Sequence, residues 1–295
     1  MAHVHSEVFA RLEEFSDAVP RTDARVEEFG GLVLFVREGA GWPFYARPRP
    51  GADPPSAADI TAVRARQREL GMPEAFEWIH DLRPDLLAVA RSASLDVLLA
   101  PLLVLDPHAL VPDLPVPDAT IRLLDPDASS FAADLRASRA VASLGFGTPA
   151  TVAAGLSTDV LAAGTLSTDV AGPRERDAAG PLDPELITAS RAKATTGQVV
   201  SAVVHAPSEG ILATGLYQRV GDVAEIAGVA TLPSARQRGY ASQLTATLAR
   251  HALQNGVTLV FLSAGDDDVA RLYARIGFRR VGTACIAEPH SAPPL

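Results

Sequence analysis

The residues with the clearest chemistry form a short turn, Arg-Gln-Arg-Gly-Tyr-Ala at 236–241, directly before a predicted helix. The first N–H groups of a helix have no partner within the helix, and they carry a partial positive charge. Gly239 lets the backbone close around an anion, while Arg236 and Arg238 can add charge-assisted contacts to phosphate. Taken alone, the same residues also fit a solvated loop, so the surroundings of the turn decide between the two.

Two further patterns flank this turn. Val229-Ala230-Thr231 ends a predicted strand before it, and Leu-Tyr-Ala-Arg-Ile-Gly-Phe at 272–278 follows it. Together the three patterns resemble the GNAT superfamily of N-acetyltransferases. The turn matches the family signature R/Q-x-x-G-x-G/A at Arg236, Gly239 and Ala241, and the last pattern matches the closing motif L-Y-x-x-x-G-F.

The resemblance implies that acetyl-CoA lies in a V-shaped opening between two strands, which the sequence predicts at 223–231 and 257–263. Backbone groups of Val229, Ala230 and Thr231 would pair with the pantetheine arm and polarise the thioester carbonyl. The pyrophosphate would be held by the turn and the first helical residues, namely Arg236, Gln237, Arg238, Gly239, Tyr240, Ala241 and Ser242. Acetyl-CoA is the expected co-substrate, and no metal ion is implied.

Two side chains are candidates for catalysis. Tyr273 matches the family's usual proton donor to the departing thiolate, and a phenol suits that role because it stays protonated at neutral pH. The competing interpretation is that Tyr273 packs its helix beside Leu272 and Ile276. Glu225 has the same spacing to Gly239 as the general base of histone-acetylating relatives, but it fits an ordinary polar residue on an alternating strand equally well.

Two other residues limit the resemblance. Many relatives carry an asparagine seven residues before the tyrosine, where this chain has Asp266. An ionised aspartate only accepts hydrogen bonds, which leaves open both a cofactor contact and a solvated helix start at that position. Cys285 lies too far along the last predicted strand to be preferred as a nucleophile.

Composition argues against several classes of protein. Of the 295 residues, 47% are hydrophobic and 21% are charged, which indicates globular cores. The net charge of −9 argues against a nucleic-acid partner, because phosphates demand a basic surface. A single cysteine and scattered histidines lack metal-ligand spacing. Without a long apolar run or a signal-peptide pattern, no membrane association is predicted and cytoplasmic localisation is expected.

The length predicts two domains. Prolines punctuate residues 106–117, which are predicted to form a semi-rigid linker or an extended edge segment because proline fixes φ. The predicted domains are therefore 1–117 and 118–295. Leu-Ser-Thr-Asp-Val occurs at 156–160 and again at 166–170. This repeat is interpreted as a duplication in a tolerant loop rather than as a binding element.

Hydrophobic periodicity predicts an α/β fold of the α+β kind for 118–295, with a mixed, largely antiparallel central sheet and flanking helices. Three strands between 199 and 231 form a meander, and the apolar run 257–263 is parallel to the strand before it. The predicted strands are 120–124, 199–205, 211–219, 223–231, 257–263 and 278–286. The predicted helices are 129–142, 184–194, one that ends at Gly256, and 267–276.

Residues 32–105 repeat much of this order. A hairpin of 32–38 and 43–47 is predicted, followed by a helix that Ser56 and Asp59 open with a capping box. A strand at 75–80, a helix at 84–92 and a strand at 97–105 complete the order. This region therefore resembles a degenerate first copy of the GNAT fold, so two tandem copies are expected.

The first copy is predicted to be catalytically silent. Pro54-Pro55 stand where Gly239-Tyr240 stand in the second copy, and two prolines remove two N–H donors from the turn. Ala90 falls at the position of Tyr273. The first domain could instead shape the acceptor pocket, with the aromatic residues Trp42, Phe44, Tyr45 and Trp78 lining it, although each fits a core position better when taken singly.

The predicted function is transfer of an acetyl group from acetyl-CoA to a primary amine by direct attack, with Tyr273 as general acid. The alternative is a non-catalytic acyl-CoA-binding or partner-binding module that retains the fold. The expected partner is a small-molecule or peptide amine.

Overall fold

The computed structural model describes residues 2–116, 118–147 and 171–290, and it divides into two compact units. The first unit comprises Met1–Leu102 and Val281–Leu295, and the second comprises Leu103–Arg280. The boundary predicted at 117 therefore falls inside the second unit. The repeat at 156–160 and 166–170 lies outside the described residues.

The proline-rich segment belongs to the second unit as far as it is described, 106–116. Asp106 N donates to Gly277 O at 3.0 Å, and Val111 N donates to Ile276 O at 3.1 Å. Pro107–Ala109 form one turn of 3-10 helix. The prolines thus break regular structure, but backbone hydrogen bonds still tie the segment to this unit, so it is not a free linker.

The second unit is built on five consecutive strands. β6 (Thr120–Leu123), β7 (Val199–Ala206), β8 (Gly210–Val220) and β9 (Val223–Thr231) pair antiparallel in chain order. β10 (Leu259–Ser263) joins β9 in parallel. The predicted meander and the parallel strand are confirmed, and the sheet is mixed and largely antiparallel. Leu259–Leu262 are all buried, as a strand covered on both faces requires.

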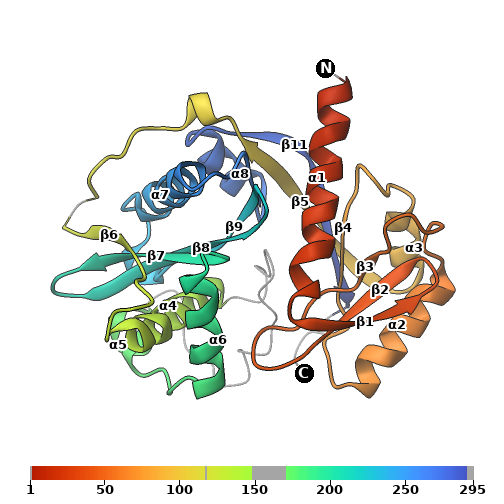
Figure 1. Ribbon diagram of the computed structural model, residues 1–295, viewed down its shortest axis with the longest axis horizontal. Helices are drawn as coiled ribbons and strands as arrows, with labels where there is room; N and C mark the ends of the chain where they lie inside the picture. The colour runs from red at the N-terminus through yellow and green to blue at the C-terminus, as the bar shows by residue number, and fades with distance from the viewer. Residues whose placement is uncertain (1, 117, 148–170, 291–295) are drawn as a thin grey trace. The chain divides into compact units, whose positions relative to one another are not determined.

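Helices flank this sheet on both faces. They are α4 (Phe131–Phe146), α5 (Pro173–Asp177), α6 (Pro184–Thr195), α7 (Tyr240–Gln254) and α8 (Asp267–Ala274). Figure 1 shows α7 on one face and α4, α5 and α6 on the other. α6 begins as predicted, because the Asp183 side chain accepts from Glu185 N at 2.8 Å and Pro184 occupies the first turn.

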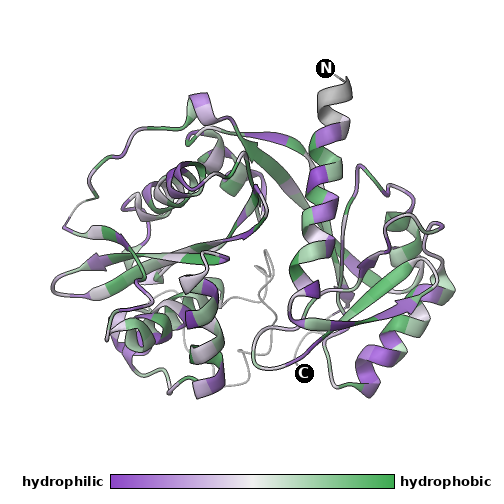
Figure 2. Ribbon diagram, in the orientation of Figure 1, coloured by the Kyte–Doolittle hydropathy of each residue, from purple (hydrophilic) through white to green (hydrophobic). Residues whose placement is uncertain are grey.

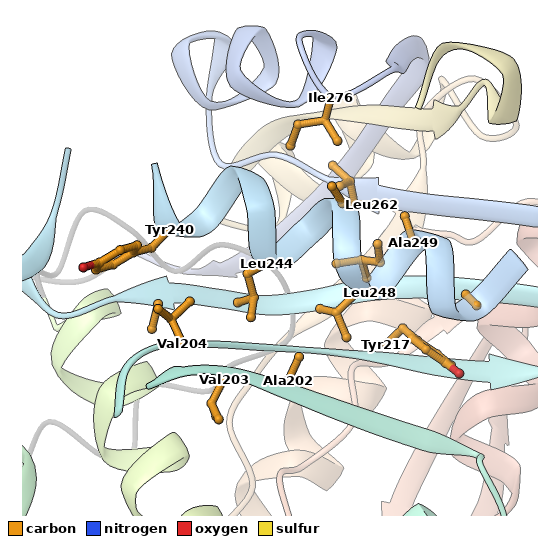
Figure 3. Packing of buried hydrophobic residues seen from close by; sticks show 14 of the residues in the cluster. Ala202, Val203, Val204, Tyr217, Tyr240, Leu244, Leu248, Ala249, Leu262 and Ile276 are labelled. Atoms are coloured by element: carbon orange, nitrogen blue, oxygen red, sulfur yellow. The ribbon is translucent and has the colours of Figure 1, made fainter. Parts of the chain in front are cut away.

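The core of the second unit lies between α7 and the sheet. Leu244 and Leu248 of α7 are fully buried, and Figure 3 shows them pointing toward the strands that carry Ala202 and Tyr217. Their spacing of four residues places both on one helix face. Packing against this face fixes the axis of α7, and with it the position of the turn that precedes the helix.

The first unit contains the remaining elements. They are α1 (Ala2–Arg21), β1 (Ala24–Phe29), β2 (Leu32–Arg37), β3 (Arg47–Pro48), α2 (Ala57–Glu69), β4 (Phe76–Ile79), α3 (Leu86–Ser92), most of β5 (Leu95–Leu105) and the end of β11 (Phe278–Pro289). Within the unit, β11 pairs antiparallel with β4 from Ala284↔Ile79 to Ala287↔Phe76. Figure 2 shows β2 as a strongly apolar strand, and five of its six residues are buried.

The predicted hairpin of 32–38 with 43–47 is wrong in its main partner. β2 pairs along its whole length with β1, from Ala24↔Arg37 to Phe29↔Leu32, whereas β3 contributes two pairs. The turn between β1 and β2 is Gly30-Gly31, with φ of +55° at Gly30. A two-residue glycine turn between alternating segments favours a tight hairpin over the longer Gly-Ala-Gly connection.

The order of elements in the two units is similar. In the first, β1, β2 and β3 are antiparallel, α2 follows, and an isolated parallel bridge joins Ala46 to Phe76 of β4. In the second, β7, β8 and β9 are antiparallel, α7 follows, and β10 is parallel to β9. Among the described helices of the chain, none combines the length and apolar character that crossing a membrane requires.

Candidate functional site

β9 and β10 pair at one end and then diverge. Their pairing runs from Leu259↔Val223 to Phe261↔Glu225, while β9 continues to Thr231 and β10 to Ser263. Both strands are fully described, and β10 does not pair with the last part of β9. The backbone of Val229, Ala230 and Thr231 thus lies on the part of β9 that β10 does not pair with.

A β-bulge shapes the same part of β9. The pairing with β8 shifts between Thr214↔Ala230 and Leu216↔Ala227, so Gly228 and Val229 together face one residue, Gly215. Gly228 has φ of +63°, a conformation that glycine adopts without strain. The bulge turns the backbone of β9 where the two strands part, which changes the direction of its polar groups.

The turn before α7 has the backbone conformation of an anion cradle. Gln237 and Gly239 both have left-handed φ, +65° and +78°. Gly239 is the N-cap of α7, and no side chain caps the helix. A Cβ added at Gly239 would have no atom within 4 Å, so this side of the turn is open. When left-handed residues alternate with residues of negative φ, neighbouring backbone N–H groups point to one spot. This arrangement, called a nest, binds phosphate in other proteins.

The two arginines of the turn differ in their contacts. Arg236 Nη2 donates to Gly145 O at the end of α4, at 2.8 Å. Arg238 Nη1 donates to Glu209 Oε1, and its Nη2 donates to Ser234 O, both at 3.3 Å. A hydrogen bond with the Tyr240 side chain, and then one with Glu209, raises the pKa of Arg238. Arg236 is therefore tied to a backbone carbonyl of α4, whereas Arg238 contacts the Tyr240 side chain, the Ser234 carbonyl and the exposed Glu209 carboxylate.

The first helical residues after the turn have different burial. Tyr240 is 2% exposed and belongs to the core cluster beneath α7, as Figure 3 shows. Ala241 and Ser242 are half-buried in the first turn of the helix. The Tyr240 side chain thus anchors the start of α7, and the contribution expected of these three residues to phosphate binding is through backbone N–H groups.

Tyr273 lies on α8 and is 8% exposed. Its ring meets Phe278 edge-on, with ring centroids 6.1 Å apart. Burial raises the pKa of the phenol to about 12, so the hydroxyl keeps its proton at neutral pH. Tyr273 also belongs to the core cluster with Ile276. Packing and proton donation are compatible here, since one side chain provides both a buried ring and a protonated hydroxyl.

Glu225 lies where β9 and β10 begin to diverge. Gln218 stands opposite it on β8, and Gln218 Nε2 donates to Glu225 Oε2 at 2.8 Å. Side chains alternate along a strand, so Gln218 shares a face with Thr214, whose hydroxyl is hydrogen-bonded to Ser138 of α4. Glu225 therefore lies on the α4 face of the sheet, opposite the face that α7 covers.

Asp266 and Cys285 have structural surroundings. Asp266 is the N-cap of α8, and its Oδ1 accepts from Val269 N at 2.8 Å. This favours the helix-start interpretation over a cofactor contact. Cys285 is fully buried in the first unit, and burial raises the pKa of its thiol to about 12, which suppresses the reactive thiolate.

The corresponding turn of the first unit is closed by its own side chains. Ser56 caps α2 and accepts from Asp59 N, while Asp59 Oδ2 accepts from Ser56 N at 2.8 Å and from Gly31 N at 3.3 Å. The predicted capping box is confirmed. The Asp59 carboxylate occupies the position at this helix start that an anionic ligand would take, and the two prolines at 54 and 55 precede it.

The four aromatic residues of the first unit named from the sequence differ in their surroundings. Trp78 is 1% exposed in the core of the unit, and the Arg37 guanidinium lies 4.0 Å from the centre of the Phe44 ring. Trp42 O accepts from Arg37 Nε, and Tyr45 is half-buried. Trp78 is thus a core residue, while Phe44 and Trp42 are engaged with one arginine.

Sequence reasoning missed several residues that shape the site. Gly228 lies inside a predicted strand, and a glycine in that position is a usable signal for a bulge. Gly145 lets α4 approach β9, because an added Cβ would lie 2.9 Å from the Ala230 Cβ. The contacts of Gln218 and Glu209 depend on strand register and turn position, which no local pattern in the sequence specifies.

Comparison with known proteins agrees with this geometry. Residues 181–278 match the family model described as Acetyltransferase (GNAT) family. No curated protein sequence is significantly similar to the chain. A GCN5-related N-acetyltransferase from Kribbella flavida has a similar structure, with 22% identity, 96% of each chain covered and a TM-score of 0.67.

More distant structures also span both units. A GCN5-related N-acetyltransferase-like protein from Streptococcus suis 89/1591 has 12% identity, covers 96% of this chain and 98% of its own, and gives a TM-score of 0.51. A putative acetyltransferase from Novosphingobium aromaticivorans has 16% identity, with 92% and 94% covered and a TM-score of 0.50. At these identities the likeness concerns the fold.

The family match covers the turn, the diverging strands and α8. The second unit therefore contains a GNAT-family match over residues 181–278, and the resemblance predicted from Arg236, Gly239, Ala241 and the 272–278 segment is confirmed.

Proposed function

We propose that this protein is an N-acetyltransferase that moves the acetyl group of acetyl-CoA to a primary amine. The observation that carries the proposal is the start of α7, where two left-handed residues and an N-terminus without a side-chain cap follow the strand that diverges from β10. An anion cradle beside an opening between parallel strands fits a ligand with a pyrophosphate at one end and an extended arm.

The residues present fit this ligand. Backbone N–H groups from Gln237 to Ser242 would hold the pyrophosphate, with Arg238 close enough to add a charged contact. Polar backbone groups of Val229 to Thr231 would pair with the pantetheine arm, because β10 leaves that part of β9 unpaired. The bulge at Gly228 supports the same role, since it redirects the backbone where the thioester carbonyl would lie.

The chemistry would be direct attack. A neutral amine nitrogen forms a bond to the carbonyl carbon of the acetyl group, and the carbon–sulfur bond then breaks. Tyr273 would donate its hydroxyl proton to the departing thiolate; burial raises the pKa of its phenol, so the proton is present at neutral pH. Glu225 would take the proton that the amine loses, directly or through water. Backbone donors would stabilise the charge on the carbonyl oxygen.

The acceptor is proposed as a small-molecule or peptide amine that reaches Glu225 from the α4 face of the sheet. The half-buried Glu225 and its partner Gln218 offer a hydrogen-bonding pair suited to an ammonium group or an amine. We assign no catalytic role to the first unit, because Asp59 closes its corresponding helix start and Ala90 stands in the place of Tyr273.

Calorimetric titration with acetyl-CoA, followed by free-thiol release across a panel of amines, tests the proposal. The panel should include polyamines, amino acids, aminoglycosides and peptides with free N-termini. Binding together with amine-dependent thiol release supports an acetyltransferase. Binding without thiol release for any acceptor favours a non-catalytic acyl-CoA-binding module, and absence of binding contradicts both assignments.

A further inference from the structure

We propose that Glu209 tunes cofactor affinity by competing with the phosphate groups of the cofactor for Arg238. The inference rests on the proposed function, since it requires that coenzyme A binds at the start of α7. It assigns a role to the β7–β8 turn, which lies outside the matched sequence motifs. Glu209 would act through Arg238 as a positioning residue, without touching the acetyl group.

The guanidinium of Arg238 is accessible, and its contact with Glu209 is a long one. Its side chain is 41% exposed, and that of Glu209 is 39% exposed. The 3.3 Å distance between Arg238 Nη1 and Glu209 Oε1 is longer than the 2.7–2.9 Å typical of charge-assisted bonds. The backbone of Arg238 stands between two left-handed residues of the cradle, Gln237 and Gly239. A bound phosphate would thus offer this guanidinium a competing anion close by.

Glu209 is presented from a fixed turn. Arg176, which is 6% exposed, donates from Nη1 to Glu209 O and to Ile211 O, both at 2.6 Å. Asp177 neutralises Arg176 through two contacts, at 2.8 and 3.0 Å. The neighbouring Gly210 has φ of +72°, and a Cβ there would lie 2.9 Å from Arg176 Nη2. Because the backbone on both sides of the Glu209 carbonyl is held, its carboxylate stays near the phosphate turn.

The other arginine of the turn provides a contrast. Arg236 donates to Gly145 O, a neutral backbone acceptor at the end of α4. Arg238 has a carboxylate among its partners, which water can solvate when Nη1 turns to a phosphate, while Nη2 can keep its contact with Ser234 O. The exchange of partners therefore falls to Arg238. An exposed ion pair contributes little, so its loss on cofactor binding should reduce affinity by about two- to fivefold.

The test is calorimetric titration of the full chain with coenzyme A. Glu209→Gln removes the competing charge but keeps the side-chain shape and the backbone carbonyl that binds Arg176. Asp127→Asn, in the loop before α4, is the matched control because it removes one exposed negative charge elsewhere. Arg238→Gln and the double variant complete a cycle that isolates the pair.

We expect Glu209→Gln to tighten coenzyme A binding about two- to fivefold. In a protein that already carries Arg238→Gln, adding Glu209→Gln should increase the affinity no more than Asp127→Asn does. Repeating the titration with 3′-dephospho-coenzyme A shows which phosphate group competes for Arg238. If Glu209→Gln no longer increases the affinity, the 3′-phosphate competes; if the increase remains, the pyrophosphate competes. Unchanged or weaker binding by Glu209→Gln, or the same gain without Arg238, overturns the inference. Failure of the unaltered protein to bind coenzyme A would contradict the proposed function itself.

Discussion

The starts of α2 and α7 occupy the same place in the order of their two units, yet their N–H groups meet different partners. At α2, Ser56 and Asp59 cap the helix, and Asp59 also binds Gly31 N. At α7, the N-cap is Gly239, which has no side chain and a left-handed φ. One helix start carries its own anion, while the other is open to an anion from outside.

The difference shows that helix position alone does not make a phosphate site. In the second unit α7 connects the parallel strands β9 and β10, and in the first unit α2 connects two segments that are joined by one isolated parallel bridge, Ala46↔Phe76. In the first unit the connection contains two prolines and ends in a capping box, so its N–H groups are either missing or satisfied. In the second unit, Gln237 and Gly239 are both left-handed, so the backbone N–H groups of the turn point toward one ligand position and remain open.

The closing helices of the two units differ in a parallel way. α3 ends before Ser94, which has φ of +60°, and α8 ends before Gly277, which also has positive φ. Counting back from these residues, Ala90 corresponds to Tyr273. Ala90 is 1% exposed and packs in the core of its unit, where it offers no proton. Both parts of the proposed chemistry are therefore confined to the second unit.

The largest effect should come from Tyr273→Phe. Because the phenol has a pKa raised to about 12, it remains a proton donor throughout the neutral range, and its loss should lower turnover by about 10²- to 10⁴-fold. Affinity for acetyl-CoA should stay within about twofold, since the ring is retained. Thiol-release kinetics and titration measure the two quantities. Turnover equal to that of the unaltered protein would remove Tyr273 from the mechanism.

Gly239→Pro should weaken acetyl-CoA binding by at least about a hundredfold. Proline removes the N–H of residue 239, and because it cannot adopt the φ of +78° seen here, it also turns a neighbouring N–H away from the ligand. The loss of these two charge-assisted hydrogen bonds accounts for the expected magnitude. Thermal unfolding shows whether the variant still folds. Gly239→Ala, for which the site has room, serves as a milder companion. Full affinity in the proline variant would mean that the cofactor binds elsewhere.

Ser242→Asp transfers the carboxylate of the first unit to the third helical position of α7, which Asp59 occupies in α2. We expect it to stabilise the start of α7 by about 1 kcal/mol or less, because acidic side chains favour a helix N-terminus. It should weaken acetyl-CoA binding about tenfold or more by placing a negative charge beside the cradle. Ser242→Asn is the neutral control. Equal affinities of the two variants would contradict a phosphate site here.

Ser56→Ala has the smallest expected effect. It removes the cap of α2 and should lower the free energy of unfolding by about 1 kcal/mol, measured by urea denaturation, without changing acetyl-CoA affinity. Although burial opposes it, the N–H groups of Ser56 and Gly31 lower the pKa of Asp59. The stabilisation from Asp59 is therefore present at neutral pH and is lost as pH falls through its folded pKa. A large change in cofactor affinity would show that the two helix starts are not independent.

Much of the second unit could be predicted because local rules and tertiary structure agree there. Asp183-Pro184 fixed the start of α6, and alternation along β7 to β9 indicated the meander. Gly239 and its neighbours in the motif point to the turn before α7, where the family match also falls. The left-handed Gln237 was not foreseen, since a non-glycine residue with positive φ has no local signature in this sequence.

The first unit was harder to predict. The sequence pattern does not indicate α1 or β1, and it predicts the wrong main partner for β2, because the short Gly30-Gly31 turn forms the hairpin rather than the longer glycine segment. The boundary near 117 was placed by proline content. The hydrogen bonds of Asp106 and Val111 that join this segment to Gly277 and Ile276 lie far apart in sequence and leave no local pattern.

The number of acetyl-CoA sites per chain tests the account most directly. Titration of the unaltered protein should give one site, and both Gly239→Pro and Ser242→Asp should remove or weaken it while Ser56→Ala leaves it intact. Two sites per chain, or one site that survives Gly239→Pro and is lost in Ser56→Ala, would contradict the conclusion that the second unit alone holds the cofactor.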